Sequence, residues 1–300
     1  MEKRRKKALF IVNPVSGKKT AKNYLFAIIR QFSDSGYEST VLMTSAKGDA
    51  LDFAERYAPY HDVVVSCGGD GTLNETVSGI MSFEPSLRPA VGFIPFGTTN
   101  DFAATHGIPT NPAEAAKLLT DGKPQPFDVG RLNKKHYFNY VASCGTFADI
   151  SYSTSQSAKN TLGHLAYVID GIKSIGGLKT LKLTVSSKEF FGVGEFVYVG
   201  ISNALTVGGT IKFNKDEVGL DDGKFEVLLV KKPKNALTVV DTLIKLSSGE
   251  FDEKEVVFFK TSKLSLRSRM PVSWTVDGEF AGLHRKVVLE NIHNAVKIVK

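Results

Sequence analysis

The chain has 300 residues, of which 42% are hydrophobic and 23% are charged, an ordinary composition for a folded protein. This length is enough for one large domain or two ordinary ones. No stretch approaches the roughly 18 uninterrupted apolar residues of a membrane span, and the basic start leads only into a short apolar run, 8–12, unlike a signal peptide. We therefore expect a cytoplasmic protein, with Cys67 and Cys144 as buried, reduced thiols.

The formal net charge is +7, and five of the first seven residues are basic. Such charge attracts nucleic acid, an anionic membrane surface or a polyanionic substrate. The sequence has no nucleic-acid recognition module and no basic run interleaved with aromatic residues, so we expect no nucleic-acid partner. The six histidines lack metal-ligand spacing and the serines lack a nucleophile elbow, which argues against metalloenzymes and hydrolases.

Up to about Gly130, strand and helix patterns alternate, which is typical of a parallel sheet covered by helices. The predicted strands are 8–12, 39–43, 62–66 and 90–94, and the predicted helices are 24–32, 51–57 and 111–121. Asn111 followed by Pro112 is typical of a helix N-cap with proline at the first helical position. The sequence thus predicts an α/β domain over residues 1–130.

After Gly130 the pattern changes to short runs of β-branched and aromatic residues, which predicts antiparallel β-structure. The predicted strands are 137–143, 181–185, 196–201, 225–230, 256–259 and 264–266, interrupted by helices over 158–175 and 237–246. We therefore expect a second domain. No repeat or long linker marks the boundary.

The most informative segment is Val63–Glu75, in which an apolar strand leads into glycines and then into a helix. The three glycines around Asp70 are Gly68, Gly69 and Gly71. They allow phosphate oxygens to approach peptide N–H groups, and the following helix N-terminus attracts an anion. Thr72 and Glu75 have capping-box spacing. An ordinary glycine turn accounts for this segment alone equally well.

Two more polar loops follow predicted strands. The segment 13–17 contains Asn13, Pro14, Ser16 and Gly17, and the segment 95–102 contains Gly97, Thr98 and Asn100. The first of these is not a Walker A loop, and taken alone it is better interpreted as a plain strand-to-helix turn. Because the carboxyl ends of parallel strands share one sheet edge, three such loops predict one nucleotide pocket.

Two aspartate–glycine segments stand out in the second half. In 219–224, Asp221 and Asp222 are oxygen ligands suited to Mg²⁺, although an Asp-Gly turn is the simpler interpretation. In 274–280, Glu279 lies between apolar strand patterns, where a carboxylate with a raised pKa would accept a proton from a hydroxyl. Taken by itself, this segment is better interpreted as a solvated turn.

Together, these segments resemble the diacylglycerol kinase catalytic family, specifically its bacterial lipid kinases, which are related to sphingosine kinases and more distantly to NAD kinases. The segments that carry the resemblance are 13–17, 68–75, 95–102, 220–223 and 276–279, in the family's order and across almost the whole chain.

The resemblance implies an N-terminal Rossmann-like α/β domain that binds ATP (1–130), a C-terminal antiparallel β-sandwich domain for the lipid substrate (131–287), and a tail (288–300) that returns to the first domain. It implies that ATP is held by Asn13, Pro14, Ser16, Gly17, Thr44, Gly68, Gly69, Asp70, Gly71, Thr72, Glu75, Thr98 and Asn100. It also implies that Glu279 is the catalytic base, that Asp222 is a magnesium ligand and that the backbone oxygens of Gly219 and Lys224 complete the metal site. Asp70 is an alternative organiser of the catalytic magnesium, through water.

The implied reaction is transfer of the γ-phosphate of ATP to diacylglycerol, giving phosphatidic acid, with Mg²⁺ as cofactor. The lipid hydroxyl is expected to enter between the domains, and the basic charge to favour reversible association with the anionic inner face of the membrane. Sphingosine, ceramide or a polyprenol remains an alternative substrate. An NAD kinase and a catalytically silent lipid-binding relative are less favoured, and the sequence leaves a homodimer open.

Overall fold

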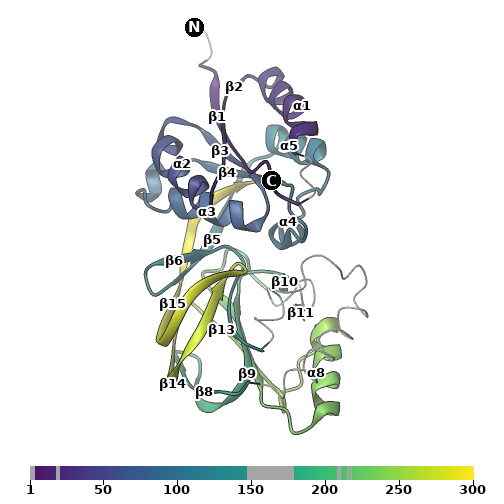
Figure 1. The fold of residues 1–300 in the computed structure, drawn as a ribbon, viewed down its shortest axis with the longest axis vertical. Helices are drawn as coiled ribbons and strands as arrows, with labels where there is room; N and C mark the ends of the chain where they lie inside the picture. The colour runs from purple at the N-terminus through teal and green to yellow at the C-terminus, as the bar shows by residue number, and fades with distance from the viewer. Residues whose placement is uncertain (1–3, 18–20, 147–178, 208–210, 215, 217) are drawn as a thin grey trace. The chain divides into compact units, whose positions relative to one another are not determined.

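The computed structural model of the chain describes residues 4–17, 21–146, 179–207, 211–214, 216 and 218–300 (Figure 1). Contacts between Cα atoms divide the chain into two compact units: unit 1 contains residues 1–129 and 294–300, and unit 2 contains residues 130–293. The predicted helix over 158–175 lies outside the described residues. Within the described part of the chain, no helix has the length and apolar character needed to cross a bilayer.

Unit 1 is built on a parallel sheet with the strand order β2-β1-β3-β4. The strands are β1 (Lys6–Val12), β2 (Tyr37–Met43), β3 (Val63–Gly68) and β4 (Ala90–Pro95). Every residue of β3 is buried, as expected for a parallel strand with both faces covered. The end of β15 (Glu279–Val299) adds a further parallel strand, in which Ile298 pairs with Val91 of β4.

Helices cover both faces of this sheet (Figure 1). On one face α1 (Ala21–Asp34) packs against α5 (Pro112–Asp121), and on the other α2 (Asp49–Tyr57) packs against α3 (Asp70–Ile80). Short elements complete the unit: α4 (Asp101–His106), η1 (Ala58–Tyr60) and η2 (Pro85–Leu87). The predicted cap of α5 is confirmed, because the Asn111 side chain accepts the N–H groups of Ala113 and Glu114.

Two hydrogen bonds attach the C-terminal segment 294–300 to the rest of unit 1. Asp128, which is fully buried, accepts the N–H of Asn294 at 2.7 Å. Arg88 donates from Nη1 to the carbonyl oxygen of Ala295, also at 2.7 Å. The last residues of the chain are therefore an integral part of this sheet.

Unit 2 is mainly antiparallel, with the strand order β13-β12-β9-β7-β14-β15. Its strands are β6 (His136–Phe138), β7 (Val141–Gly145), β8 (Leu181–Ser187), β9 (Phe191–Ser202), β12 (Phe225–Lys231), β13 (Val256–Thr261), β14 (Lys263–Val276) and most of β15; the short pair β10 (Thr206–Val207) and β11 (Ile211–Lys212) and the helix α8 (Ala236–Ser248) complete it. The strand β5 (Pro124–Leu132) begins in unit 1 and pairs with β6. The long strands β9 and β14 each pair with β7 at one end and β8 at the other, so the pairing closes around a core.

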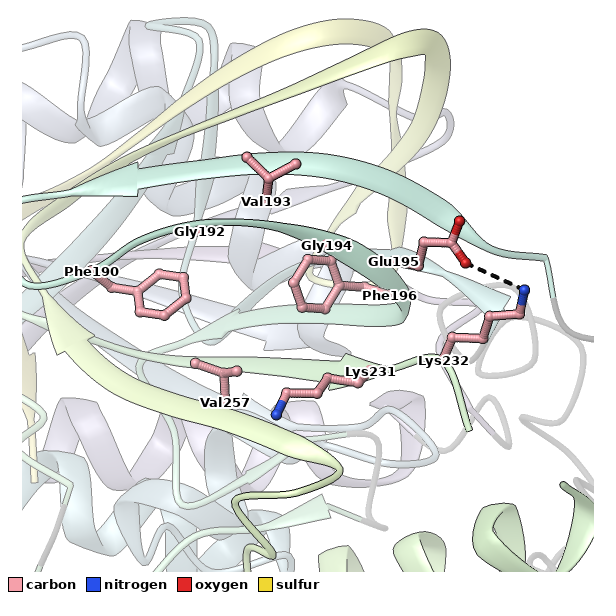
Figure 2. Close-up of a pocket in the computed structure, with 9 residues that line it drawn as sticks. All are labelled: Phe190, Gly192, Val193, Gly194, Glu195, Phe196, Lys231, Lys232 and Val257. Atoms are coloured by element: carbon pink, nitrogen blue, oxygen red, sulfur yellow. Dashed lines mark hydrogen bonds and ion pairs between the residues drawn. The ribbon is translucent and has the colours of Figure 1, made fainter. Parts of the chain in front are cut away.

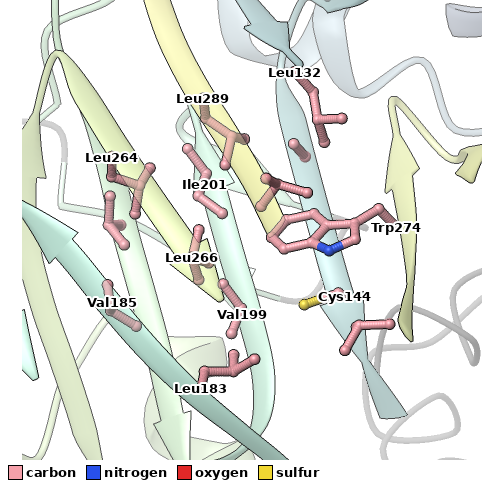
Figure 3. Packing of buried hydrophobic residues seen from close by; sticks show 14 of the residues in the cluster. Leu132, Cys144, Leu183, Val185, Val199, Ile201, Leu264, Leu266, Trp274 and Leu289 are labelled. Carbon is pink, nitrogen blue, oxygen red and sulfur yellow. The ribbon is translucent and has the colours of Figure 1, made fainter. Parts of the chain in front are cut away.

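That core is an apolar cluster in which Trp274, only 2% exposed, lies beside Cys144 (Figure 3). The rings of Phe138 and Phe225 stack in it with centroids 5.3 Å apart. Cys144 and Cys67, the latter in unit 1, are both buried and neither forms a disulfide, as expected from the sequence.

Two predicted strands differ from the structure. The run 137–143 is split into β6 and β7, because the backbone N–H groups of residues 139–141 turn toward the carboxylate of Asp277 instead of joining one strand ladder. The run 264–266 is only part of the 14-residue strand β14. Side-chain acceptors far away in sequence leave no local pattern, which explains the first difference.

Candidate active site

The first loop of unit 1 is fastened to the second by hydrogen bonds at the carboxyl ends of β1 and β3. The N–H of Asn13 donates to the carbonyl oxygen of Cys67 at 2.8 Å, and its side-chain amide donates to Thr72 Oγ1 at 3.2 Å. The other side-chain atom, Asn13 Oδ1, accepts the N–H of Val15 and shapes the loop as a turn. The side chain of Asn13 therefore links the first loop to Thr72, which lies 59 positions further along the chain.

The third loop approaches both of the others at the level of the backbone. The N–H of Phe96 donates to the carbonyl oxygen of Gly68 at 2.7 Å. A Cβ atom on Gly97 would lie 2.7 Å from the Cα of Gly69, and one on Gly17, whose φ is +52°, would collide with the carbonyl oxygen of Phe96. Only glycine allows these approaches. We call residues 13–17, 68–72 and 96–100 the three-loop cluster.

Asp70 connects the second loop to the third. Its carboxylate accepts the N–H groups of Asp101 at 3.2 Å and Phe102 at 3.3 Å, at the start of α4. Burial raises the pKa of Asp70, and these N–H groups counteract part of that effect. Asn100 precedes α4 with a left-handed φ of 51° and donates from its side chain to the carbonyl oxygen of Gly97 at 2.9 Å. The glycine pattern did not predict this use of Asp70.

The predicted capping box is wrong. Helix α3 begins at Asp70 and its N-cap is Gly69, so Thr72 lies inside the first turn. Glu75 does not reach back to the helix start, because its carboxylate accepts the N–H of Gly48 at 3.0 Å. An extended glycine satisfies the N-cap position without a side chain, and this frees Thr72 to bind Asn13.

The structure thus brings most of the predicted ATP residues together. The three-loop cluster contains Asn13, Pro14, Ser16, Gly17, Gly68, Gly69, Asp70, Gly71, Thr72, Thr98 and Asn100. Thr44 follows β2, and its N–H donates to the carbonyl oxygen of Val12 at 2.9 Å, immediately before the first loop. The 11-residue helix α3 directs its N-terminal N–H groups into the cluster, an arrangement that suits an anion.

The second candidate region is the turn between β14 and β15 in unit 2. Val276 pairs with Glu279, and the residues between them, Asp277 and Gly278, both have positive φ, so they form a two-residue hairpin turn. The carboxylate of Asp277, 4% exposed, accepts the N–H groups of Asn139, Tyr140 and Val141, at 2.6, 3.0 and 3.1 Å. Asp277 therefore fixes the turn that carries Glu279, a role for which the sequence held no specific signal.

Glu279 is exposed at the first position of β15, which agrees with the interpretation of this segment as a solvated turn. A strand start beside a tight turn projects its side chain toward solvent, and the buried acid of this turn is Asp277. Phe280 and Leu283, on the same strand, are 61% and 65% exposed. Glu279 thus stands on a stretch that also presents apolar side chains.

The predicted magnesium ligands lie together in the loop before β12, but the donor atoms of Asp222 and Lys224 already have protein partners. Asp222 Oδ2 lies 2.6 Å from Lys260 Nζ, and Asp222 Oδ1 accepts the N–H of Lys224 at 2.9 Å. The carbonyl oxygen of Lys224 accepts the side-chain amide of Asn291 at 3.0 Å, and Gly219 packs against the Asp222 carboxylate. Among the residues described, no group of three or more His, Cys, Asp or Glu is arranged around a metal position. In this arrangement the Asp222 carboxylate is paired with an ammonium group, so a metal ion would have to displace Lys260 in order to bind it.

A surface pocket of about 440 Å³ opens on another part of unit 2 (Figure 2). One side carries an ion pair between Glu195 and Lys232 at 3.3 Å, and Glu195 also pairs with Lys182. Its lining residues are Phe190, Gly192, Val193, Gly194, Glu195, Phe196, Lys231, Lys232 and Val257. None of the predicted site residues lines this pocket.

Comparison with known proteins identifies the family. The model of the diacylglycerol kinase catalytic domain matches residues 7–132. The chain is 30% identical over 280 residues to diacylglycerol kinase from Bacillus subtilis, covering 93% of this chain and 91% of that protein. It is 33% identical over 282 residues to diacylglycerol kinase from Staphylococcus aureus, with 93% and 87% covered. A crystal structure of a diacylglycerol kinase from Bacillus anthracis has the same fold, with a TM-score of 0.78 at 24% identity over 99% of this chain and 98% of that one. The chain therefore belongs to the diacylglycerol kinase catalytic family and is a lipid kinase.

Proposed function

We propose that this lipid kinase transfers the γ-phosphate of ATP to the hydroxyl of diacylglycerol, giving phosphatidic acid. The observation that carries the proposal is the backbone convergence of three glycine-containing loops at the carboxyl edge of the unit 1 sheet. In this proposal unit 1 is a Rossmann-like module that binds ATP, and unit 2 is a β-sandwich module that receives the lipid. Ligands bind at this edge of parallel sheets.

The three-loop cluster supplies what phosphoryl transfer requires of a protein: positioning of the donor and neutralisation of charge. Backbone N–H groups around Gly69 and Gly71, at the start of α3, face the phosphates, and the hydroxyls of Ser16 and Thr98 add hydrogen bonds. Thr44 extends the site at the end of β2. Mg²⁺, when bound with ATP, would neutralise charge on the phosphate oxygens, and we assign Asp70 to organise that ion through water.

Glu279 is proposed as the general base. Its carboxylate accepts the proton of the lipid hydroxyl, the hydroxyl oxygen forms a bond to the γ-phosphorus, and the bond from that phosphorus to the bridging oxygen of ADP breaks. The exposure of Glu279 makes it accessible to a substrate. The exposed Phe280 and Leu283 offer apolar contact to the lipid.

The net charge of +7 supports reversible association of the enzyme with an anionic membrane surface, and we assign that association to the cytoplasmic face of the membrane. Each cation near such a surface contributes about 1 kcal/mol, and the attraction declines within a Debye length. Binding to anionic vesicles is therefore expected to weaken as salt is raised.

A phosphotransfer assay tests the proposal. The protein is incubated with γ-labelled ATP, Mg²⁺ and, separately, diacylglycerol, sphingosine, ceramide, undecaprenol and NAD, the lipids in mixed micelles. We expect label in diacylglycerol, and a fall in kcat of about 100-fold or more for Glu279→Gln with ATP binding retained. Glu253→Gln, which alters another exposed glutamate of unit 2, is the matched control and should keep full activity. Label entering only another acceptor would refute the assigned substrate, and full activity of Glu279→Gln would remove the proposed base.

A further inference from the structure

Three charged side chains of unit 2 form a compact group beside the loop 219–224. Glu226 on β12 and Lys260 on β13 are directly paired across the two strands. Lys260 Nζ lies 2.6 Å from Asp222 Oδ2 and 3.4 Å from Glu226 Oε1. One ammonium group therefore contacts two carboxylates that come from different elements.

Glu226 is the unusual member of this group. Its side chain is fully buried, and neither carboxylate oxygen has a hydrogen-bond partner within the described residues. A buried carboxylate is costly unless an opposite charge compensates it. The only ion pair recorded for Glu226 in the described structure is the one with Lys260. Lys260 thus supplies the compensating charge for a buried acid as well as for Asp222.

The same loop is the place where the family resemblance implies Mg²⁺. A metal ion there would need the Asp222 carboxylate, which is in contact with an ammonium group, and the Lys224 carbonyl oxygen, which accepts from Asn291. An ammonium group and a divalent cation repel each other at the few ångströms that separate ligands of one site. The two cations are therefore alternatives, and the geometry described has the ammonium group in place.

We propose that Lys260 is the resident cation of this site and stands in place of a divalent metal ion. Unit 2 then folds without bound Mg²⁺. Removing the ammonium group leaves two acidic side chains, Asp222 and Glu226, in a loop region that also holds the carbonyl oxygen of Lys224, and oxygen donors of this kind suit a hard divalent cation. This inference is separate from the proposed function, because the Mg²⁺ that accompanies ATP belongs to unit 1.

Thermal unfolding without nucleotide tests the proposal. The Tm of the wild-type protein should be the same in EDTA and in millimolar MgCl₂. Lys260→Met should lower the Tm by about 5 °C or more, because it leaves a buried carboxylate without its counter-charge, and Mg²⁺ should restore part of the loss. Lys260→Arg should keep the wild-type behaviour. Lys263→Met, which removes a lysine paired with Glu290 on the neighbouring strand, is the control and should show no response to Mg²⁺.

Direct counting of bound Mn²⁺ by electron paramagnetic resonance provides a second readout that does not depend on activity. We expect Lys260→Met to bind one more Mn²⁺ than the wild-type protein, and the addition of Asp222→Asn to abolish that extra site. The proposal would be overturned if wild-type protein gained stability from Mg²⁺ and lost the gain in Asp222→Asn. Because that arm does not need Lys260→Met, it stays decisive even if that variant does not fold.

Discussion

Asp70 in unit 1 and Asp277 in unit 2 each precede a glycine, and each accepts backbone N–H groups from a distant part of the chain. Asp70 is partly exposed and accepts two such groups at 3.2 and 3.3 Å, so it joins two loops that together face a ligand. Asp277 is buried and accepts three at 2.6 to 3.1 Å, so it fixes a turn. In Asp222, the third example, the carboxylate pairs with a lysine. The same dipeptide therefore has three roles, which depend on what surrounds the carboxylate.

The largest effect that this comparison predicts is on stability, at Asp277. Asp277→Ala leaves three backbone N–H groups without their acceptor, and each unsatisfied group costs about 1–3 kcal/mol, so the free energy of unfolding should fall by about 3 kcal/mol or more. Urea unfolding followed by the fluorescence of Trp274, the only tryptophan, measures this loss, because Trp274 lies in unit 2 with Asp277. Asp221→Ala, an exposed neighbour of Asp222, is the control. Equal unfolding midpoints for the two variants would contradict the role of Asp277.

A second prediction concerns the close approach of glycines in the three-loop cluster. Gly97→Ala places a methyl group 2.7 Å from the Cα of Gly69 and should weaken ATP binding at least about tenfold. Gly69→Ala brings its methyl group only to 3.3 Å from the Cα of Gly97, so its effect should be smaller. Isothermal titration calorimetry measures both affinities, and circular dichroism checks that the fold is retained. Unchanged affinity in Gly97→Ala would separate this contact from ATP binding.

The smallest predicted effect is on the pH dependence of stability, and it comes from the packed ring of His106 in unit 1. The ring of His106 lies against Phe102 and Phe127, with centroids 4.3 and 5.0 Å away, and both of its nitrogens are buried without a hydrogen-bond partner in the described structure. Burial, together with the smaller effect of the nearby charge of Lys300, lowers the pKa of His106 to about 3. Between pH 6.5 and about 3, His106 is therefore protonated in the unfolded chain and neutral in the folded protein.

It follows that the stabilising contribution of neutral His106 is complete above pH 6.5 and is lost as the pH falls toward 3. Between pH 7 and 5.5 the free energy of unfolding should fall by about 1 kcal/mol on this account. His106→Phe should remove that part of the slope while keeping the aromatic packing. Denaturant titrations at several pH values measure it, and an identical slope in His106→Phe would contradict the assignment.

The three-loop cluster could be predicted from the sequence because its signals are local. A glycine-containing loop follows each of three strands of the predicted parallel sheet, and parallel strands have their carboxyl ends at the same edge of a sheet. The partners of the buried acids could not be predicted in this way. Asp277 binds residues 136 to 138 positions away, and Lys260 lies 38 positions from Asp222. The glycine-rich segment also does not reveal that Gly69 is the N-cap of α3, without a capping side chain.

The most direct test of the central claim is a crystal structure of the protein with a non-hydrolysable ATP analogue and Mg²⁺. We expect the triphosphate to contact the loops 13–17, 68–72 and 96–100 at the same time, with peptide N–H groups at the start of α3 donating to phosphate oxygens. An analogue bound with its phosphates away from the start of α3, or in contact with only one of these loops, would contradict the account.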